Sequence, residues 1–472
     1  MNIPLRGTLV AALACGTVPA FVSTPAAAAT DTDLVEIRQQ LKLMKDAYEQ
    51  RIAALEAKLA QTESTARRAG EDAARAQADA TAAAQRPASA SSFNPEISLV
   101  LSGNYTRLSQ SPSLRRIQGF VPAGGEAMPE TRSFNLGESE LGISANIDPL
   151  FRGNLRLSVA GDNTVGVEEA TVETLALGAG ANLKAGRFLS GIGYQNQQHA
   201  HTWDFSDAPL AYQAFFGGTL GMDGVQARWL APTPFYLELG AEAARARSFP
   251  ANDEDRDKNG LMSGAVFAHA GGDVGISNSW RAGVSYFGTS PSERSFDDPL
   301  VSGLKNHISA NSRTWVLDGV WKWAPGGDAS ERYVKLQGEY FRRSENGALT
   351  YDTDNALLGT QRGDYRSRQS GFYAQAVWQF MPRWRVGYRY DRLDSGTMAL
   401  GLVDSGALTL ASLPLLAAYN PHRNTLMADW SPSEFSRIRL QFARDASRPD
   451  ATDNQVWLQY VMSLGAHGAH NF

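Results

Sequence analysis

The stretch Glu138–Val159, ESELGISANIDPLFRGNLRLSV, decides the fold class. Apolar or small residues occupy the odd positions 139–147, and polar residues or glycine occupy the even positions between them. Positions 154–159 alternate in the same way. Because successive side chains of a β-strand point to opposite faces, this pattern predicts two strands with one apolar and one polar face each. Asp148-Pro149-Leu150-Phe151 has the composition of a tight turn, so the stretch predicts an antiparallel hairpin.

The same alternation recurs from Ile97 to the end of the chain and predicts sixteen strands. Their ranges are 97–107, 134–147, 152–161, 165–177, 181–188, 221–230, 235–247, 262–276, 280–287, 313–323, 332–343, 368–380, 383–393, 422–431, 436–445 and 454–464. A short turn follows nearly every even-numbered strand, whereas most of the other connections are long and polar. This asymmetry is typical of bacterial outer-membrane proteins. We therefore predict an all-β membrane protein, a 16-stranded antiparallel outer-membrane β-barrel.

A soluble β-sandwich or propeller would also contain many alternating strands. Two features argue against it. Aromatic residues gather near strand ends on the apolar phase, which suits the girdles of a membrane barrel; they are Trp315, Trp321, Trp323, Trp384, Tyr388 and Tyr390. The opposite phase carries Arg383, Arg385, Arg389 and Asp391, and a packed soluble core would not tolerate such charges.

The N-terminus predicts export. Arg6, an apolar core over 9–22 and Ala27-Ala28-Ala29 make residues 1–29 a signal peptide. The only cysteine, Cys15, lies inside it, so disulfides and thiolate metal sites are excluded from the mature chain. No later run of 18 apolar residues predicts a transmembrane helix. The net charge of −5 indicates no nucleic-acid partner.

Residues 30–63 predict an α-helical coiled coil ahead of the barrel domain (93–472). Leu34, Ile37, Leu41, Met44 and Tyr48 follow the 3-4 spacing of a and d positions. A single amphipathic helix packed on a domain is the alternative. Residues 64–92 are rich in alanine and predict a linker.

Residues 189–220 separate two predicted strands and are too polar and irregular to be a strand. We predict a constriction loop folded into the lumen, because a barrel of sixteen strands leaves an aqueous interior. Its hydrogen-bonding and titratable candidates are Tyr194, Gln195, Asn196, His199, His201, Asp204 and Asp207.

Charged residues on the inward phase are predicted to line the pore. The basic ones are Arg152, Arg156, Arg228, Lys335, Arg383, Arg385, Arg389, Arg437 and Arg439, and the acidic ones are Glu138, Glu140, Glu169, Glu173 and Glu238. Most of the arginines fall on strands near the closure of the ring, facing the acids, and would create a transverse field. Alternatively, the charges pair with one another and brace the wall.

The loop histidines raise the question of a cofactor. His199-x-His201 with Asp204 is chemically able to hold Zn²⁺, although such histidines more often serve as hydrogen-bonding residues. Residues 255–260 match the start of a Ca²⁺ loop, but no glutamate stands at its twelfth position, which favours a solvated loop. No enzyme motif is present, and His269 with Ser263 or Ser285 lacks an acid placed by spacing, so we expect no enzyme.

In architecture the chain resembles the phosphate-selective-porin-like group of outer-membrane porins. The features shared are the signal, the coiled coil, the linker, the strand count, the terminal Phe472 and Lys184-Ala185-Gly186-Arg187-Phe188 before the third long loop. The lysine-rich phosphate ladder of that group is not evident. The resemblance implies a homotrimer embedded in outer-membrane lipid of a Gram-negative bacterium, with the coil in the periplasm.

The sequence thus predicts passive diffusion of small hydrophilic, charged solutes through a loop-constricted pore. Two alternatives stay open. One is an outer-membrane anchor whose coil binds peptidoglycan or another periplasmic partner. The other is a divalent-metal channel for zinc.

Overall fold

The computed structural model describes residues 95–123, 132–161, 164–251, 259–291 and 294–465, together with nine residues between Gln39 and Ala53. The chain divides into two compact units, 1–92 and 93–472. The nine N-terminal residues are helical and exposed, and Lys45 lies 3.7 Å from Glu49 one turn later. The signal peptide, most of the coiled-coil stripe, the linker and Phe472 lie outside the described residues. None of the described helices is long and apolar enough to cross a membrane.

The second unit contains one sheet of 18 described strands. They are β1 (Glu96–Leu108), β2 (Ser133–Leu136), β3 (Ser139–Asn146), β4 (Phe151–Val159), β5 (Val165–Thr174), β6 (Ala181–Leu189), β7 (Gly221–Leu230), β8 (Tyr236–Ala246), β9 (Ser263–Val274), β10 (Asn278–Thr289), β11 (Arg294–Asp297), β12 (Lys305–Trp323), β13 (Tyr333–Tyr351), β14 (Gln361–Met381), β15 (Trp384–Leu400), β16 (His422–Ser433), β17 (Ser436–Ala446) and β18 (Asp453–Gly465). Two short α-helices, α2 (Leu210–Phe216) and α3 (Gly401–Asp404), lie in connections.

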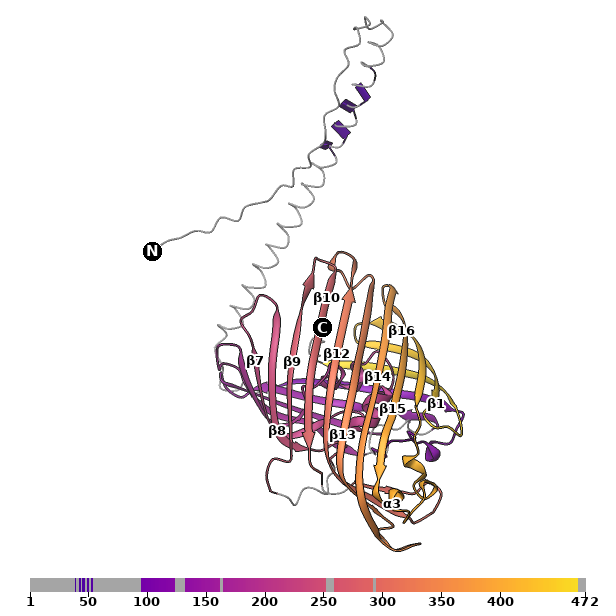
Figure 1. Ribbon diagram of the computed structural model, residues 1–472. Helices are drawn as coiled ribbons and strands as arrows, with labels where there is room; N and C mark the ends of the chain where they lie inside the picture. The colour runs from indigo at the N-terminus through magenta and orange to yellow at the C-terminus, as the bar shows by residue number, and fades with distance from the viewer. Residues whose placement is uncertain are drawn as a thin grey trace, which may run out of the picture. The chain divides into compact units, whose positions relative to one another are not determined.

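The 18 strands make sixteen positions in the wall. Strands β2 and β3 both pair with β1, one after the other, and β10 and β11 both pair with β12. Each of these two pairs therefore counts as one interrupted wall strand. All pairings are antiparallel, and β1 closes the ring on β18 from Ser98↔Gly465 to Leu108↔Gln455. The prediction of a 16-stranded antiparallel barrel is confirmed (Figure 1).

The predicted hairpin forms as β3 and β4, from Ser139↔Val159 to Asn146↔Arg152. Strand boundaries were less well predicted in the second half, where β12 begins at Lys305 instead of 313 and β13 ends at Tyr351 instead of 343. In these extensions the outward residues are polar, such as Ser309 and Asn311, so the apolar phase stops before the strand does. Strands β12 to β15 form a tall wall that reaches the region of α3 in Figure 1.

The outer face of the tall wall carries an apolar belt. On β12, Trp315, Leu317, Trp321 and Trp323 are 37–52% exposed, while the alternating Val316 is buried. The eight steps from Trp315 to Trp323 span about 27 Å along the strand. A belt of about 25 Å flanked by aromatic residues is what a transmembrane barrel presents to lipid.

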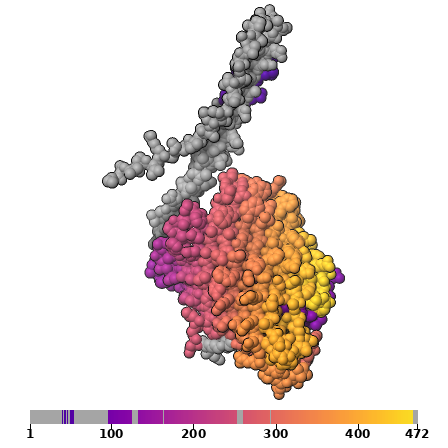
Figure 2. All heavy atoms as spheres, viewed as in Figure 1, coloured from indigo at the N-terminus to yellow at the C-terminus, as the bar shows by residue number. Residues whose placement is uncertain are grey.

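The barrel has a turn end and a loop end. Short connections, such as 147–150, 382–383 and 434–435, define the turn end, which also holds the start of β1 and the end of β18. Figure 2 shows the outer surface of the wall from β7 to β16.

The interior is packed at two levels by apolar clusters. One surrounds α2, and the other, nearer the loop end, joins β11–β15 with the connection 401–421.

Candidate functional site

The connection between β6 and β7 is the candidate functional site; we call residues 190–220 the crossing loop. Asn196 ties its two ends together and is fully buried. The Asn196 side chain donates to the carbonyls of Ser190 (2.8 Å) and Leu220 (3.1 Å) and accepts from the Leu220 N–H (2.6 Å). The loop is therefore a compact body with its own internal bonds, held close to its two strands.

Two buried glutamates of the wall, on β8 and β13, fasten the loop. Glu339 on β13 accepts from the N–H of Gln195 (2.8 Å) and from the hydroxyls of Tyr212 (2.9 Å) and Tyr373 (2.7 Å). Glu242 on β8 accepts from the Ser190 hydroxyl (2.5 Å) and the Gly191 N–H (2.7 Å). Two carboxyl groups that each accept several bonds hold this segment firmly, because leaving the buried N–H and O–H donors unpaired would be costly.

The middle of the loop reaches the arginine-rich strands β13–β17. Asp204 lies 3.0 Å from Lys335 Nζ and 3.1 Å from Arg385 Nη1. Asp207 lies 2.9 Å from Arg389 Nη2 and 2.6 Å from Arg423 Nη1.

These cations stabilise the ionised form of both aspartates. Burial raises the pKa of Asp207, but Arg423 and Arg389 outweigh it and bring the pKa from 3.8 to about 2. Burial is outweighed in the same way at Asp204, where Lys335 and Arg385 lower the pKa. Both aspartates therefore remain charged at neutral pH and clamp the loop to this side.

Helix α2 packs the returning part of the loop into the apolar interior. Phe215 stacks on Phe341 at 5.6 Å, and Phe216 meets Phe287 edge to face at 6.0 Å. Gly217 ends the helix with φ of 70°, a left-handed conformation that glycine adopts without strain. The loop thus runs from β6 across the lumen to β13–β17 and back to β7.

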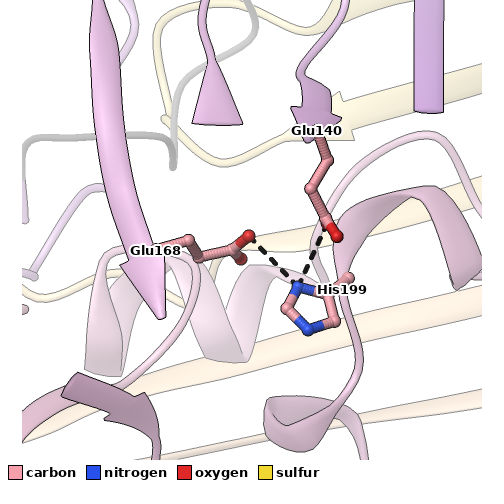
Figure 3. Close-up of side chains that lie close together, drawn as sticks. All are labelled: Glu140, Glu168 and His199. Atoms are coloured by element: carbon pink, nitrogen blue, oxygen red, sulfur yellow. Dashed lines mark hydrogen bonds and ion pairs between the residues drawn. The ribbon is translucent and has the colours of Figure 1, made fainter. Parts of the chain in front are cut away.

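On the opposite side the loop meets the acidic strands β3 and β5. His199 Nδ1 lies 3.1 Å from Glu168 Oε2 and 3.3 Å from Glu140 Oε2, and His199 Nε2 lies 3.3 Å from Glu169 Oε2. Figure 3 shows Glu140 and Glu168 converging on the His199 ring from two strands. Burial lowers the pKa of His199, but the surrounding carboxylates, Glu168 first, raise it well above 6.5.

A β-bulge places the two consecutive glutamates on one face. Arg156 pairs with Glu169, but the next residue, Leu157, pairs with Val167, so Glu168 is the extra residue of β5. A bulge breaks the alternation of side chains and re-aims one of them. Both Glu168 and Glu169 therefore contact His199, from its two ring nitrogens.

The predicted basic residues fall into two groups. Arg152 and Arg156 of β4 lie among acids: Arg152 Nη2 is 2.5 Å from Glu96, and Arg156 contacts Glu140 and Glu169. The predicted arginine wall therefore does not include them. Arg383 lies in the turn between β14 and β15, is exposed, and donates to the Pro432 carbonyl (2.8 Å).

The remaining predicted positions lie along the lumen. Arg437 and Arg439 donate to loop carbonyls of His201 (2.5 Å) and Trp203 (2.7 Å). Arg228 lies 3.7 Å from Glu238, and Lys184 lies 4.0 Å from Glu173. Glu138 stands at the break between β2 and β3. Tyr194, near the start of the loop, is buried, with Lys335 and Arg281 over its ring.

The structure does not bring together all three residues predicted to bind a metal, His199, His201 and Asp204. His199 and His201 stack with ring centroids 5.9 Å apart, but Asp204 is engaged by Lys335 and Arg385. The acidic positions of the candidate calcium loop, 253, 255 and 257, lie outside the described residues. Ser285 accepts from the Gly193 N–H (3.1 Å) and Ser263 bonds Thr289 (2.8 Å), so each serine has a structural partner.

Sequence reasoning missed Glu168, Glu339 and Arg423. Glu339 and Arg423 stand on the inward phase of predicted strands and could have been found by alternation alone. Glu168 could not, because strict alternation assigns adjacent Glu168 and Glu169 to opposite faces.

No family model matches the chain. An uncharacterized protein of Aquifex aeolicus (strain VF5) is 33% identical over 415 residues, which cover 82% of this chain and 81% of the relative. This chain belongs to the family of that protein. The shared region covers most of the length of both chains.

The chain is also similar to solved outer-membrane barrels at low identity. OmpT of Vibrio cholerae is 10% identical with a TM-score of 0.46, covering 78% of this chain and 97% of that one. An anion-selective porin from Comamonas acidovorans is 12% identical with a TM-score of 0.46, covering 78% and 99%. The outer-membrane channel DcaP of Acinetobacter baumannii is 12% identical with a TM-score of 0.46, covering 78% and 97%.

Proposed function

We propose that this protein is a porin: a passive channel in the outer membrane of a Gram-negative bacterium for small hydrophilic solutes. The observation that carries the proposal is a closed 16-strand barrel whose lumen is crossed by a polar loop clamped to charged walls. The apolar belt from Trp315 to Trp323 supports a place in lipid. In this proposal, solutes pass through the lumen beside the crossing loop, along the side where charged side chains are partly exposed.

The charges on opposite walls differ in sign and support a transverse field. Toward the turn end of β12–β17 stand five cations, Lys322, Lys335, Arg385, Arg437 and Arg439, with two carboxylates, Asp204 and Asp429. Strands β1 and β3–β6 carry the carboxylates Glu96, Glu140, Glu168, Glu169 and Glu173, with Arg152, Arg156 and Lys184 among them; Arg187 of β6 pairs with Asp223 of β7. Such a field orients dipolar solutes and screens charged ones.

In this proposal the turn end faces the periplasm, and the coiled coil predicted over residues 30–63 lies in the same compartment. The coil is available to peptidoglycan or another periplasmic partner. We also propose a homotrimer. The wall is low at β3–β6, whose strands have 8–10 residues against 17–21 in β13–β15, and nearby Phe134 on β2 is 83% exposed. A neighbouring copy would cover this low apolar wall.

The test is single-channel current through the purified full-length protein in a planar bilayer under a salt gradient. We expect conductance steps in groups of three. In the Lys322→Glu variant the reversal potential shifts toward cation preference, because Lys322 is an inward cation without an acidic partner among the described ion pairs. Arg313→Gln, on the outer face of the same strand, serves as the control.

Absence of any current, with a folded barrel, would overturn the channel and point to the anchor function. Deleting residues 31–85 then separates the two classes. A channel keeps conducting without the coil, whereas an anchor loses its periplasmic partner.

A further inference from the structure

Three donor atoms from three elements converge beside the crossing loop. They are Nδ1 of His199 from the loop, Oε2 of Glu140 from β3 and Oε2 of Glu168 from β5. The donor atoms of Glu140, Glu168 and His199 all lie within 4.8 Å of one another. The three side chains are 5–14% exposed, so the cluster is mostly shielded from water.

The separations fit one small cation. Zinc bonds nitrogen and oxygen ligands at about 2.0–2.2 Å, so the edges of its tetrahedron are about 3.3–3.6 Å long. His199 Nδ1 lies 3.1 Å from Glu168 Oε2 and 3.3 Å from Glu140 Oε2, and His201 Nδ1 lies 3.4 Å from the same Glu140 oxygen. An ion placed among Glu140, Glu168 and His199 would need only small adjustments of these three side chains.

Neighbouring charged residues hold these donor atoms in place, as metal ligands require. A ligating histidine usually donates its other ring N–H to a carboxylate, which fixes the ring and its tautomer. Here Nε2 of His199 lies 3.3 Å from Glu169 Oε2. Arg156 contacts the Oε1 atom of Glu140 and so leaves Oε2 turned toward the histidines.

We propose that this cluster is a site for a divalent transition-metal ion of the Zn²⁺ class, with His199, Glu140 and Glu168 as ligands. Mixed imidazole and carboxylate donors suit Zn²⁺ better than Mg²⁺ or Ca²⁺, which take oxygen ligands. Three protein ligands leave the fourth position of a tetrahedral ion open to water. The ion fastens the crossing loop to β3 and β5, opposite the clamp formed by Asp204 and Asp207.

The inference stands apart from the proposed channel function, because metal binding is measured without conduction. The chain is purified at full length in detergent, treated with EDTA and titrated with ZnCl₂ by calorimetry at neutral pH. We expect one Zn²⁺ per chain. The single variants His199→Ala and Glu168→Gln should each weaken binding more than tenfold, and Glu169→Gln should weaken it about 10–100-fold through loss of the carboxylate behind His199.

Two controls keep the test specific. Glu173→Gln removes another inward carboxylate of β5, and His422→Ala removes an exposed histidine; both should bind Zn²⁺ as the wild type does. Each variant must keep the heat-modifiable migration of a folded barrel in gel electrophoresis. X-ray absorption of the zinc complex should show only nitrogen and oxygen neighbours near 2.0 Å, including imidazole.

Wild-type protein that binds no Zn²⁺ would overturn the proposal. So would Zn²⁺ binding that persists unchanged in a folded Glu168→Gln variant, because the ion would then lie elsewhere. If Zn²⁺ binds as expected but the bilayer shows no current, the metal site stands and the channel function fails.

Discussion

Glu339 alone accepts several of the hydrogen bonds that fix the crossing loop to the wall. It accepts bonds from the crossing loop and from Tyr373 of the neighbouring strand, and its side chain is buried. Replacing it by alanine leaves several buried donors without an acceptor, and each costs about 1–3 kcal/mol. We expect Glu339→Ala to destabilise the barrel by at least about 2 kcal/mol and to expose the crossing loop to protease. Thermal unfolding and limited proteolysis measure these effects, and Glu331→Ala in an exposed turn should show neither.

The lowered pKa of Asp207 indicates how the stability of the folded protein depends on pH in acid. Its folded pKa of about 2 lies below the ordinary 3.8, so its contribution to stability is complete above pH 4 and is lost as the pH falls through 2. The shift corresponds to a contribution on the order of 2 kcal/mol. The unfolding midpoint of the wild type should fall between pH 4 and pH 2, and Asp207→Asn should remove part of that fall. Equal slopes for the two proteins would contradict the assignment.

Individual residues of the site were only partly predictable from sequence. The polar composition of residues 189–220 indicates an inward loop, because a lipid-facing or solvent-facing segment would not need Tyr194, His199 and Asp207 together. Which strand each side chain meets depends on the path of the loop across the lumen. For this reason Asp204 was grouped with the histidines, whereas the structure places it against Lys335 and Arg385.

At the scale of elements, the connection 401–421 forms a cover over the loop-end interior. Leu402, Leu413 and Leu416 pack into the apolar cluster with β11–β15, and Gln118 of the first loop donates to the carbonyls of Pro414 (2.6 Å) and Ala417 (3.1 Å). Replacing residues 402–416 by a glycine-serine linker removes this packing. We expect single-channel conductance to rise about twofold or more.

The matched control replaces residues 353–359 at the tip between β13 and β14 by a linker of the same composition. That tip contributes no residue to the two interior clusters, so conductance should stay unchanged. A cover variant with wild-type conductance would show that the current does not depend on this connection.

The number of wall strands could be predicted because apolar and polar residues alternate wherever one face of a strand meets lipid and the other meets the lumen. Element length could not be predicted for β12–β15. Above the belt the outer face is polar, as at Asn311 and Arg313, and the inner face mixes polar and apolar residues, as at Ala310 and Ser312, so the period of two fades from the hydropathy pattern. The interruption of β2 and β3 at Gly137 was likewise invisible to the alternation.

At the scale of the whole molecule, the outer belt determines where the barrel sits in lipid. Leu317 is 51% exposed within the belt, about 7 Å along the strand from Trp315. An arginine at the bilayer midplane on the lipid face costs about 2–4 kcal/mol, but the cost falls to about 0–1 kcal/mol near the interface. We expect Leu317→Arg to impair folding into lipid vesicles, whereas Asn311→Arg, on the same face of the same strand but above the belt, should fold normally. The fraction of heat-modifiable protein in dilauroylphosphatidylcholine vesicles measures both, and equal fractions would place the belt elsewhere.

The length of strands β12–β15 beyond the belt determines how far the tip between β13 and β14 projects from the membrane. Ten residues separate Trp315 at the upper edge of the belt from Lys305 at the start of β12, a reach of about 34 Å along the strand. At its summit, Asp352 accepts from the N–H groups of Ala356, Leu357, Leu358 and Gly359 at 2.6–2.9 Å, so the tip is internally braced. In the proposed orientation, a peptide epitope inserted after residue 358 would be displayed above the outer leaflet, where antibodies and phage particles make their first contact with a bacterium.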